Sequence, residues 1–178
     1  MLDVAVAYNR YKYLGNEFLT WLWFMMETDR SGLAFPEAES TELEIGNRIV
    51  LENNRQNRDE TITIKGDGAG LEEGVLALKK GALVTEVSLI MKAPEAEWRF
   101  QIKGESLNIT GLKPPEKNPA EKSEDIEERV LEQIAHVERA ADLVHQLYQQ
   151  FIQQRLSEDW AETTVPAITR WITQSVGS

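Results

Sequence analysis

The sequence contains no cysteine, so disulfides, thiolate metal sites and cysteine nucleophiles are excluded. The first 13 residues lack the basic segment and apolar run that are typical of a signal peptide. The longest apolar run covers residues 18–26 and is interrupted by Thr20, whereas a helix that spans a bilayer needs roughly 20 apolar residues. We therefore expect no membrane segment and a cytoplasmic location.

Positive charge is also scarce. The 178 residues include 19 Lys and Arg against 30 Asp and Glu, which gives a formal net charge of -11. Proteins that bind duplex DNA through bulk charge use Lys and Arg to neutralise phosphates, so any DNA contact here has to be local. The length and the apolar content of 42% suit one compact domain, with or without a helical extension.

Catalytic and ligand-binding motifs are missing as well. The two histidines, His136 and His145, are nine residues apart on one expected helix, which is not the spacing of a helical metal pair. The segment GDGAGLEEG lacks the Lys-Ser/Thr of a P-loop and the spacing of a dinucleotide site, and there is no G-x-S-x-G. We expect no enzyme activity, no metal and no cofactor.

The segment YLGNEFLTWLWF predicts a helix over residues 16–27, with Asn16 as its N-cap and a stop in the segment TDRSG. Trp21 and Trp23 lie on nearly opposite sides of this helix, so it has to be covered all round. It is interpreted as a central core helix, or as a helix that packs partly against another subunit.

The middle of the chain alternates with the period of a β-strand. The string TELEIGNRIVLEN predicts a hairpin that turns at Gly46-Asn47, and further strands are expected over residues 60–65, 83–92 and 97–103 and through Leu107 and Ile109. A short amphipathic helix over residues 71–80 ends at Gly81. We predict an α+β fold: a small, mostly antiparallel sheet with an inserted short helix, in a core domain of residues 1–112.

A linker rich in proline and charge, residues 113–125, precedes a helical segment, residues 126–178, that packs on the core or on a partner. Apolar residues with heptad spacing run from Val130 to Phe151, a length greater than a small sheet readily covers. A terminal helix with Pro166 in its first turn follows. We expect self-association through Val137, Val144, Tyr148 and Phe151; the alternative is that the long helix packs wholly on its own protomer.

Two basic features are candidates for contact with nucleic acid. Arg10 and Lys12 alternate with tyrosines in YNRYKY, a mixture that stacks on bases and pairs with phosphates. Lys79 and Lys80 end the short helix. Each feature has a structural interpretation too: tyrosines at the edge of the core with cations in solvent, and lysines that complement a helix dipole.

The segment YLGNEFLTWLWF resembles the motif FLGxEFLTWLWF of the bacterial recombination-associated protein RdgC family, in its divergent branch. The resemblance continues in order through IGNRIVLE, LKKGALVTEVSL, EWRFQI, LNITGLKPP and LYQQFIQQRLSEDW. It implies a nucleoid-associated dimer that binds DNA without marked sequence preference and restrains strand exchange. The chain resembles the C-terminal part of that family, which leaves open a partner protein that supplies the N-terminal part.

Three hypotheses follow from these features. The chain is an RdgC-like accessory protein of recombination or of phage or nucleoid DNA metabolism, or it is an acidic module for protein interaction and oligomerisation. The third hypothesis is an enzyme such as a nuclease, a label often given to the family, but the sequence fixes no cluster of carboxylates for a catalytic metal.

Overall fold

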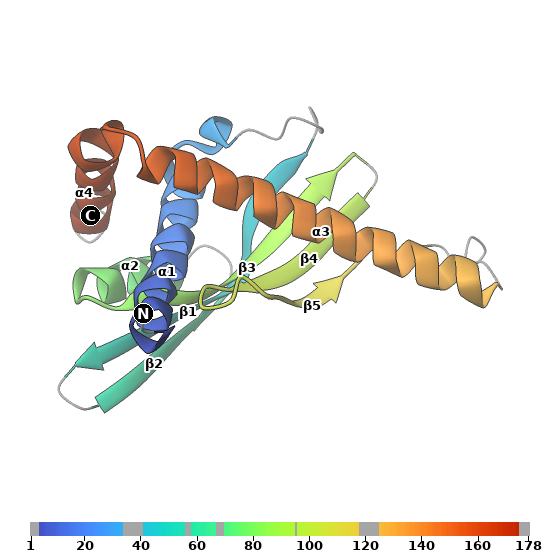
Figure 1. The fold of residues 1–178 in the computed structure, drawn as a ribbon, viewed down its shortest axis with the longest axis horizontal. Helices are drawn as coiled ribbons and strands as arrows, with labels where there is room; N and C mark the ends of the chain where they lie inside the picture. Colours follow the sequence, from blue (N-terminus) through green and yellow to red (C-terminus); the bar gives the residue numbers. More distant parts are fainter. Residues whose placement is uncertain are drawn as a thin grey trace.

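The computed structural model describes residues 4–33, 41–55, 58–66, 70–94, 96–117 and 125–174. It confirms the predicted α+β fold: five antiparallel strands in the order β2-β1-β3-β4-β5, with helices across one face (Figure 1). The strands are β1 (Glu42–Arg55), β2 (Arg58–Lys65), β3 (Leu83–Ala93), β4 (Ala96–Lys103) and β5 (Ile109–Lys113). The helices are α1 (Val4–Thr28), α2 (Gly70–Lys79), α3 (Ile126–Arg155) and α4 (Val165–Gln174).

The first helix begins earlier than its sequence predicts. Asn16 is not an N-cap, because α1 starts at Val4 and runs through Gly15 without interruption. A Cβ atom at Gly15 would lie 1.7 Å from the carbonyl oxygen of Gly104, so the glycine allows the helix to touch the turn after β4. Close approach between backbones is a second use of glycine, besides breaking a helix. Asn16 is buried at this contact.

The predicted hairpin turn at Gly46-Asn47 is wrong, since β1 continues through both residues as one long strand. The pairing with β3 shifts register between Ile45 and Ile49, which marks a β-bulge. A Cβ atom at Gly46 would lie 2.3 Å from the hydroxyl of Ser88, so only glycine fits there without a shift. The hairpin of this region instead joins β1 to β2.

The last strand begins later than predicted and extends to Lys113. Ile109 begins β5, but Leu107 lies in the turn before it with φ at +55°, a left-handed conformation that is rare for a leucine. The two neighbouring strands follow the prediction more closely. In β4, Trp98, Phe100 and Ile102 are buried on the helix side, as their alternation predicts.

The core is centred on α1, which lies between the sheet and α3. Phe18, Trp21 and Phe151 form an aromatic cluster in which every pair of ring centroids is 5.6 to 6.3 Å apart. The Trp21 indole donates a hydrogen bond of 2.8 Å to Oε1 of Gln154. The C-terminal half of α3 therefore shares one core with the sheet and α1.

The N-terminal half of α3 is different, because it extends beyond the sheet (Figure 1). Lys113, the first residue of the predicted linker, ends β5, and Asp125 caps α3 by accepting a hydrogen bond of 2.9 Å from the backbone N–H of Glu127. Residues 118–124 of that linker lie outside the described residues. The overhanging half exposes large apolar side chains, whereas the C-terminal half of α3 buries them.

Candidate functional site

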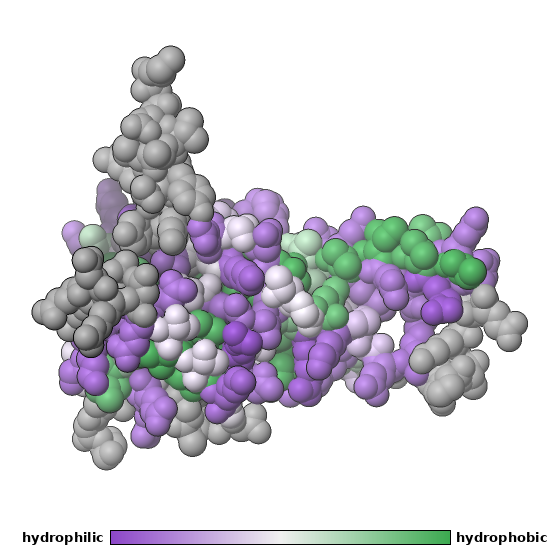
Figure 2. Space-filling view, turned by 90° about the horizontal axis from the view of Figure 1, so that it is seen from below, coloured by the Kyte–Doolittle hydropathy of each residue, from purple (hydrophilic) through white to green (hydrophobic). Residues whose placement is uncertain are grey.

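We call residues 126–137 of α3 the α3 arm. Five of its large apolar side chains are exposed, with exposed fractions from 48% at Ile134 to 73% at Ile126. Together they form the apolar stripe: Ile126, Val130, Leu131, Ile134 and Val137. Figure 2 shows apolar surface gathered along this overhanging helix. Single exposed apolar residues are ordinary, but a contiguous set on one helix is typical of an interaction surface.

Helix geometry places carboxylates beside this stripe. At about 100° per residue, four members of the stripe fall within an arc of roughly 80° that ends at Ile134. Glu127 and Glu138 follow within the next 40° or so, between Ile134 and Leu131, and both are exposed. Arg129 lies on the other side of the four-residue arc. The α3 arm thus presents four neighbouring apolar side chains with two carboxylates along one edge, and Leu131 lies beyond these carboxylates.

Three contacts fasten the α3 arm and the residues just after it to the body of the protein. The Trp98 indole of β4 donates a hydrogen bond of 3.1 Å to Nδ1 of His136, and the Arg139 guanidinium lies 4.7 Å from the centroid of the same indole ring. Lys117 pairs with Glu132, and this contact, with a smaller contribution from His136, holds the pKa of the Glu132 carboxyl below its usual value. The arm is therefore held in place while its stripe stays exposed.

The structure separates the four residues predicted for self-association. Val137 is 53% exposed and belongs to the stripe, whereas Val144 and Phe151 are buried in the core of their own protomer. Tyr148 is half-buried, and burial raises the pKa of its phenol. Its ring packs edge-on against the ring of Phe18, with the two ring centroids 5.3 Å apart. The heptad pattern thus serves two purposes, since its second half forms the core and only its first half is available.

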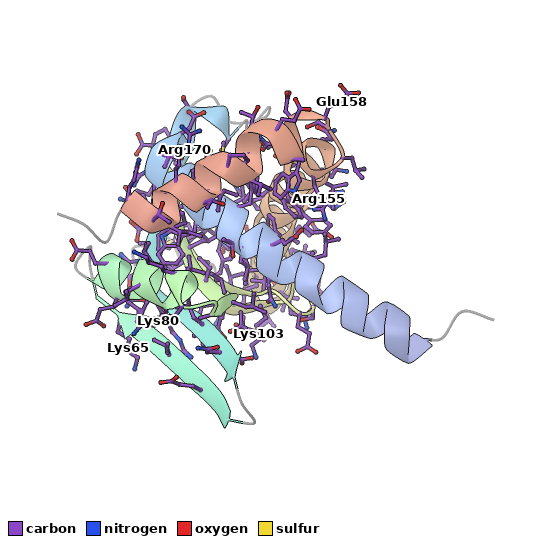
Figure 3. All side chains as sticks on the ribbon, turned by 90° about the vertical axis from the view of Figure 1, so that its left-hand side faces the viewer. Lys65, Lys80, Lys103, Arg155, Glu158 and Arg170 are labelled. Carbon is purple, nitrogen blue, oxygen red and sulfur yellow. The ribbon has the colours of Figure 1, made fainter. Side chains whose placement is uncertain are left out.

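The structure also places the predicted nucleic-acid contacts. Arg10 and Lys12 belong to α1, but their side chains lie outside the described part of the structure. Lys79 and Lys80 are exposed at the end of α2 and form no ion pair with described residues. These two lysines lie at the end of the molecule opposite the α3 arm (Figures 1 and 3).

An apolar groove opens near these lysines, between α1, the end of α2 and α4, and we call it the α1–α4 groove. It has a volume of about 440 Å³. Its apolar lining includes Leu78, Leu83, Trp160, Val165, Ile168 and Ile172. Leu83 and Val165 are each about 40% exposed at this groove. Sequence reasoning missed it because three separate helices form it; the only signal was the apolar face of the terminal helix.

Two absences concern the described residues alone. They hold no group of three or more metal-ligating side chains that could bind a metal ion. His136 is engaged with Trp98, and His145 lies 2.9 Å from the side-chain amide of Gln149. None of the helices in this part of the chain is long and apolar enough to cross a membrane.

Comparisons of the chain with models of protein families, with curated proteins and with solved structures find no match. Function is therefore inferred from the α3 arm, the α1–α4 groove and the charges around them.

Proposed function

We propose that this protein is a non-catalytic assembly module that oligomerises through the α3 arm. The observation that carries this proposal is the apolar stripe, whose five large side chains project from the overhanging half of α3. Water around such side chains is released when a second protein surface covers them, at roughly 25 cal/mol per Å² of apolar area buried.

The arm is suited to docking because contacts within the protomer already hold it as an ordered helix. Asp125 caps its first turn, and the contacts of Lys117 and Trp98 hold it along its length. A preorganised helix loses little conformational entropy on binding, which favours affinity. Pairs of apolar residues four positions apart, here Val130 with Ile134, are the usual anchors when a helix binds in a groove.

Sedimentation velocity over a range of concentrations tests this proposal. We expect the wild-type protein to be associated, and the double variant Val130→Ser/Ile134→Ser to be a folded monomer. Leu156→Ser is the matched control, because Leu156 is 80% exposed but lies outside the stripe. A wild-type protein that stays monomeric throughout, or an arm variant that associates like wild type, would refute oligomerisation through the arm.

A second candidate function is DNA association of the RdgC type, as the sequence resemblance implies. It is favoured by Lys79 and Lys80, which are exposed and form no ion pair within the described part of the chain. A few local cations of this kind would bind phosphate weakly and without reading sequence. With the net charge of -11, these cations would also have to act against repulsion between the protein and the phosphates.

A DNA retention assay separates this candidate from the first. If the local cations bind DNA, log affinity should fall with log salt at a slope of about 2 to 4, because each neutralised phosphate contributes roughly 0.9. Changing Arg10, Lys12, Lys79 and Lys80 to Glu should abolish retention, while Val130→Ser/Ile134→Ser should leave the slope unchanged. Retention that survives the four reversals would refute this mode of DNA binding.

A further inference from the structure

We propose that the α3 arm of one copy docks in the α1–α4 groove of a second copy, so that the protein assembles head to tail. This inference rests on the proposed oligomerisation and names the surface that receives the arm. It follows from three relationships between the two surfaces: both are apolar, their borders carry opposite charge, and they lie at opposite ends of the protomer.

The apolar parts match in kind and scale. The groove, at about 440 Å³, has room for side chains but not for a whole helix, and aliphatic and indole groups form much of its lining. A helix would therefore lie across its rim and insert the two residues of one apolar turn. Val130 and Ile134 are the pair on the arm that is spaced for this, and Val165 and Leu83 are exposed on the groove to meet them.

The charged borders are complementary. Lys79 and Lys80 lie between Leu78 and Gly81 in the chain, and both of these neighbours line the groove. Arg170 follows Thr169, another lining residue. Figure 3 faces this end of the protein and shows Lys80 and Lys103 on one side of it, with Arg170 and Arg155 on the other.

Among the described residues, the lining of the groove includes one carboxylate. Glu17 lines the groove, but Arg155 pairs with it at 2.8 Å. Glu158 lies farther out, beyond Arg155 (Figure 3). Lys80 and Arg170 are exposed and form no ion pair with described residues, so they are available to Glu127 and Glu138 of a docked arm. Opposite charge at a border gives specificity and faster association more than affinity.

The positions of the two surfaces exclude docking within one protomer. The arm extends from one end of the molecule, and α2 and α4 lie at the other (Figure 1). Each copy therefore offers its arm to one neighbour and its groove to another. Such a contact joins two different surfaces, so it closes into a ring or continues as an open chain according to its rotation.

Charge reversal on each surface tests the inference. The arm variant is Glu127→Lys/Glu138→Lys and the groove variant is Lys80→Glu/Arg170→Glu. Each variant alone brings like charges together, so we expect each to sediment as a monomer at concentrations where wild type is associated. In an equal mixture every arm meets a groove of opposite charge, and we expect assembly to return. Glu27→Lys/Glu60→Lys is the control for net charge, since both residues are exposed and neither belongs to the α3 arm nor lines the groove; it should assemble like wild type.

The outcomes distinguish this inference from the function on which it rests. If the arm variant and Val130→Ser/Ile134→Ser dissociate but the groove variant assembles normally, the arm docks elsewhere and only the inference is refuted. If both reversal variants dissociate and their mixture stays monomeric, the two surfaces do not meet. If the serine variant assembles like wild type, the proposed function itself is wrong. Circular dichroism of each variant checks that it is folded.

Discussion

The indole N–H of Trp98 donates a hydrogen bond of 3.1 Å to Nδ1 of His136, and this contact joins β4 to the point where α3 leaves the body of the protein. On the C-terminal side of it, α3 is buried against α1; on the N-terminal side lies the α3 arm. Trp98 thus connects the core of the sheet to the helical segment that we propose for docking.

Trp98→Phe should loosen the arm selectively. The change removes the indole donor but keeps an aromatic ring, so the net loss of stability should be about 1 kcal/mol, the typical contribution of one hydrogen bond. In hydrogen exchange measured on monomeric protein, amides of residues 126–137 should lose protection while those of residues 140–151 keep theirs. An equal loss of protection along the whole of α3 would show that the contact does not act locally.

Val137 and Val144 offer a matched pair one heptad apart. Val137→Glu should change the stability of the monomer by no more than about 0.5 kcal/mol, as for most surface substitutions. Val144→Glu places a charge where the side chain is only 5% exposed and should cost about 3–5 kcal/mol or unfold the protein. Urea denaturation of the two variants measures the difference. Similar midpoints would contradict the separation of α3 into a buried half and an exposed half.

Trp21→Ala should be among the most destabilising single changes. The side chain is 2% exposed, and its truncation leaves a cavity beside Phe18 and Phe151, at a cost of about 3–5 kcal/mol. Trp21→Phe is the control, because it keeps an aromatic ring and loses the hydrogen bond to Gln154 together with only part of the side-chain volume. If the alanine variant melted within about a degree of wild type, the central position of α1 in the core would be wrong.

Acid should release the contact between Lys117 and Glu132. The hydrogen bond from Lys117 lowers the pKa of the Glu132 carboxyl below its ordinary 4.5 in the folded protein. A lowered carboxyl pKa means that the contact stabilises the fold above the unfolded pKa, and that this contribution is lost as the pH falls through the folded pKa. An NMR titration of Glu132 should show its pKa rise toward 4.5 in Lys117→Met. An unchanged pKa would show that Lys117 is not the cause.

Local patterns were enough to predict most of the fold. Alternation predicts the buried side chains of β4, and heptad spacing predicts the extent of α3, because both patterns follow from the period of the element itself. The start of α1 and the turn at Gly46 were predicted wrongly because the roles of Gly15 and Gly46 depend on Gly104 and Ser88, which are distant in sequence and meet them only in the folded chain.

The candidate site was predicted only in part. The excess of apolar length in α3 indicated a surface that remains available, but the sequence placed it at Val144 and Phe151 as well as Val137. Which half of a regular stripe is buried depends on where α1 and the sheet end, and no local period contains that information. The α1–α4 groove required the relative positions of three helices and so lay beyond sequence reasoning.

The most direct test of the account is whether the α3 arm is covered when the protein assembles. Because the chain has no cysteine, a single Ile134→Cys variant can be alkylated at one site, with Leu156→Cys as the exposed control. We expect the rate at position 134 to fall as the protein concentration rises through the range of assembly, while the rate at position 156 stays constant. Equal rates at position 134 in the dilute and the assembled protein would contradict docking through the α3 arm.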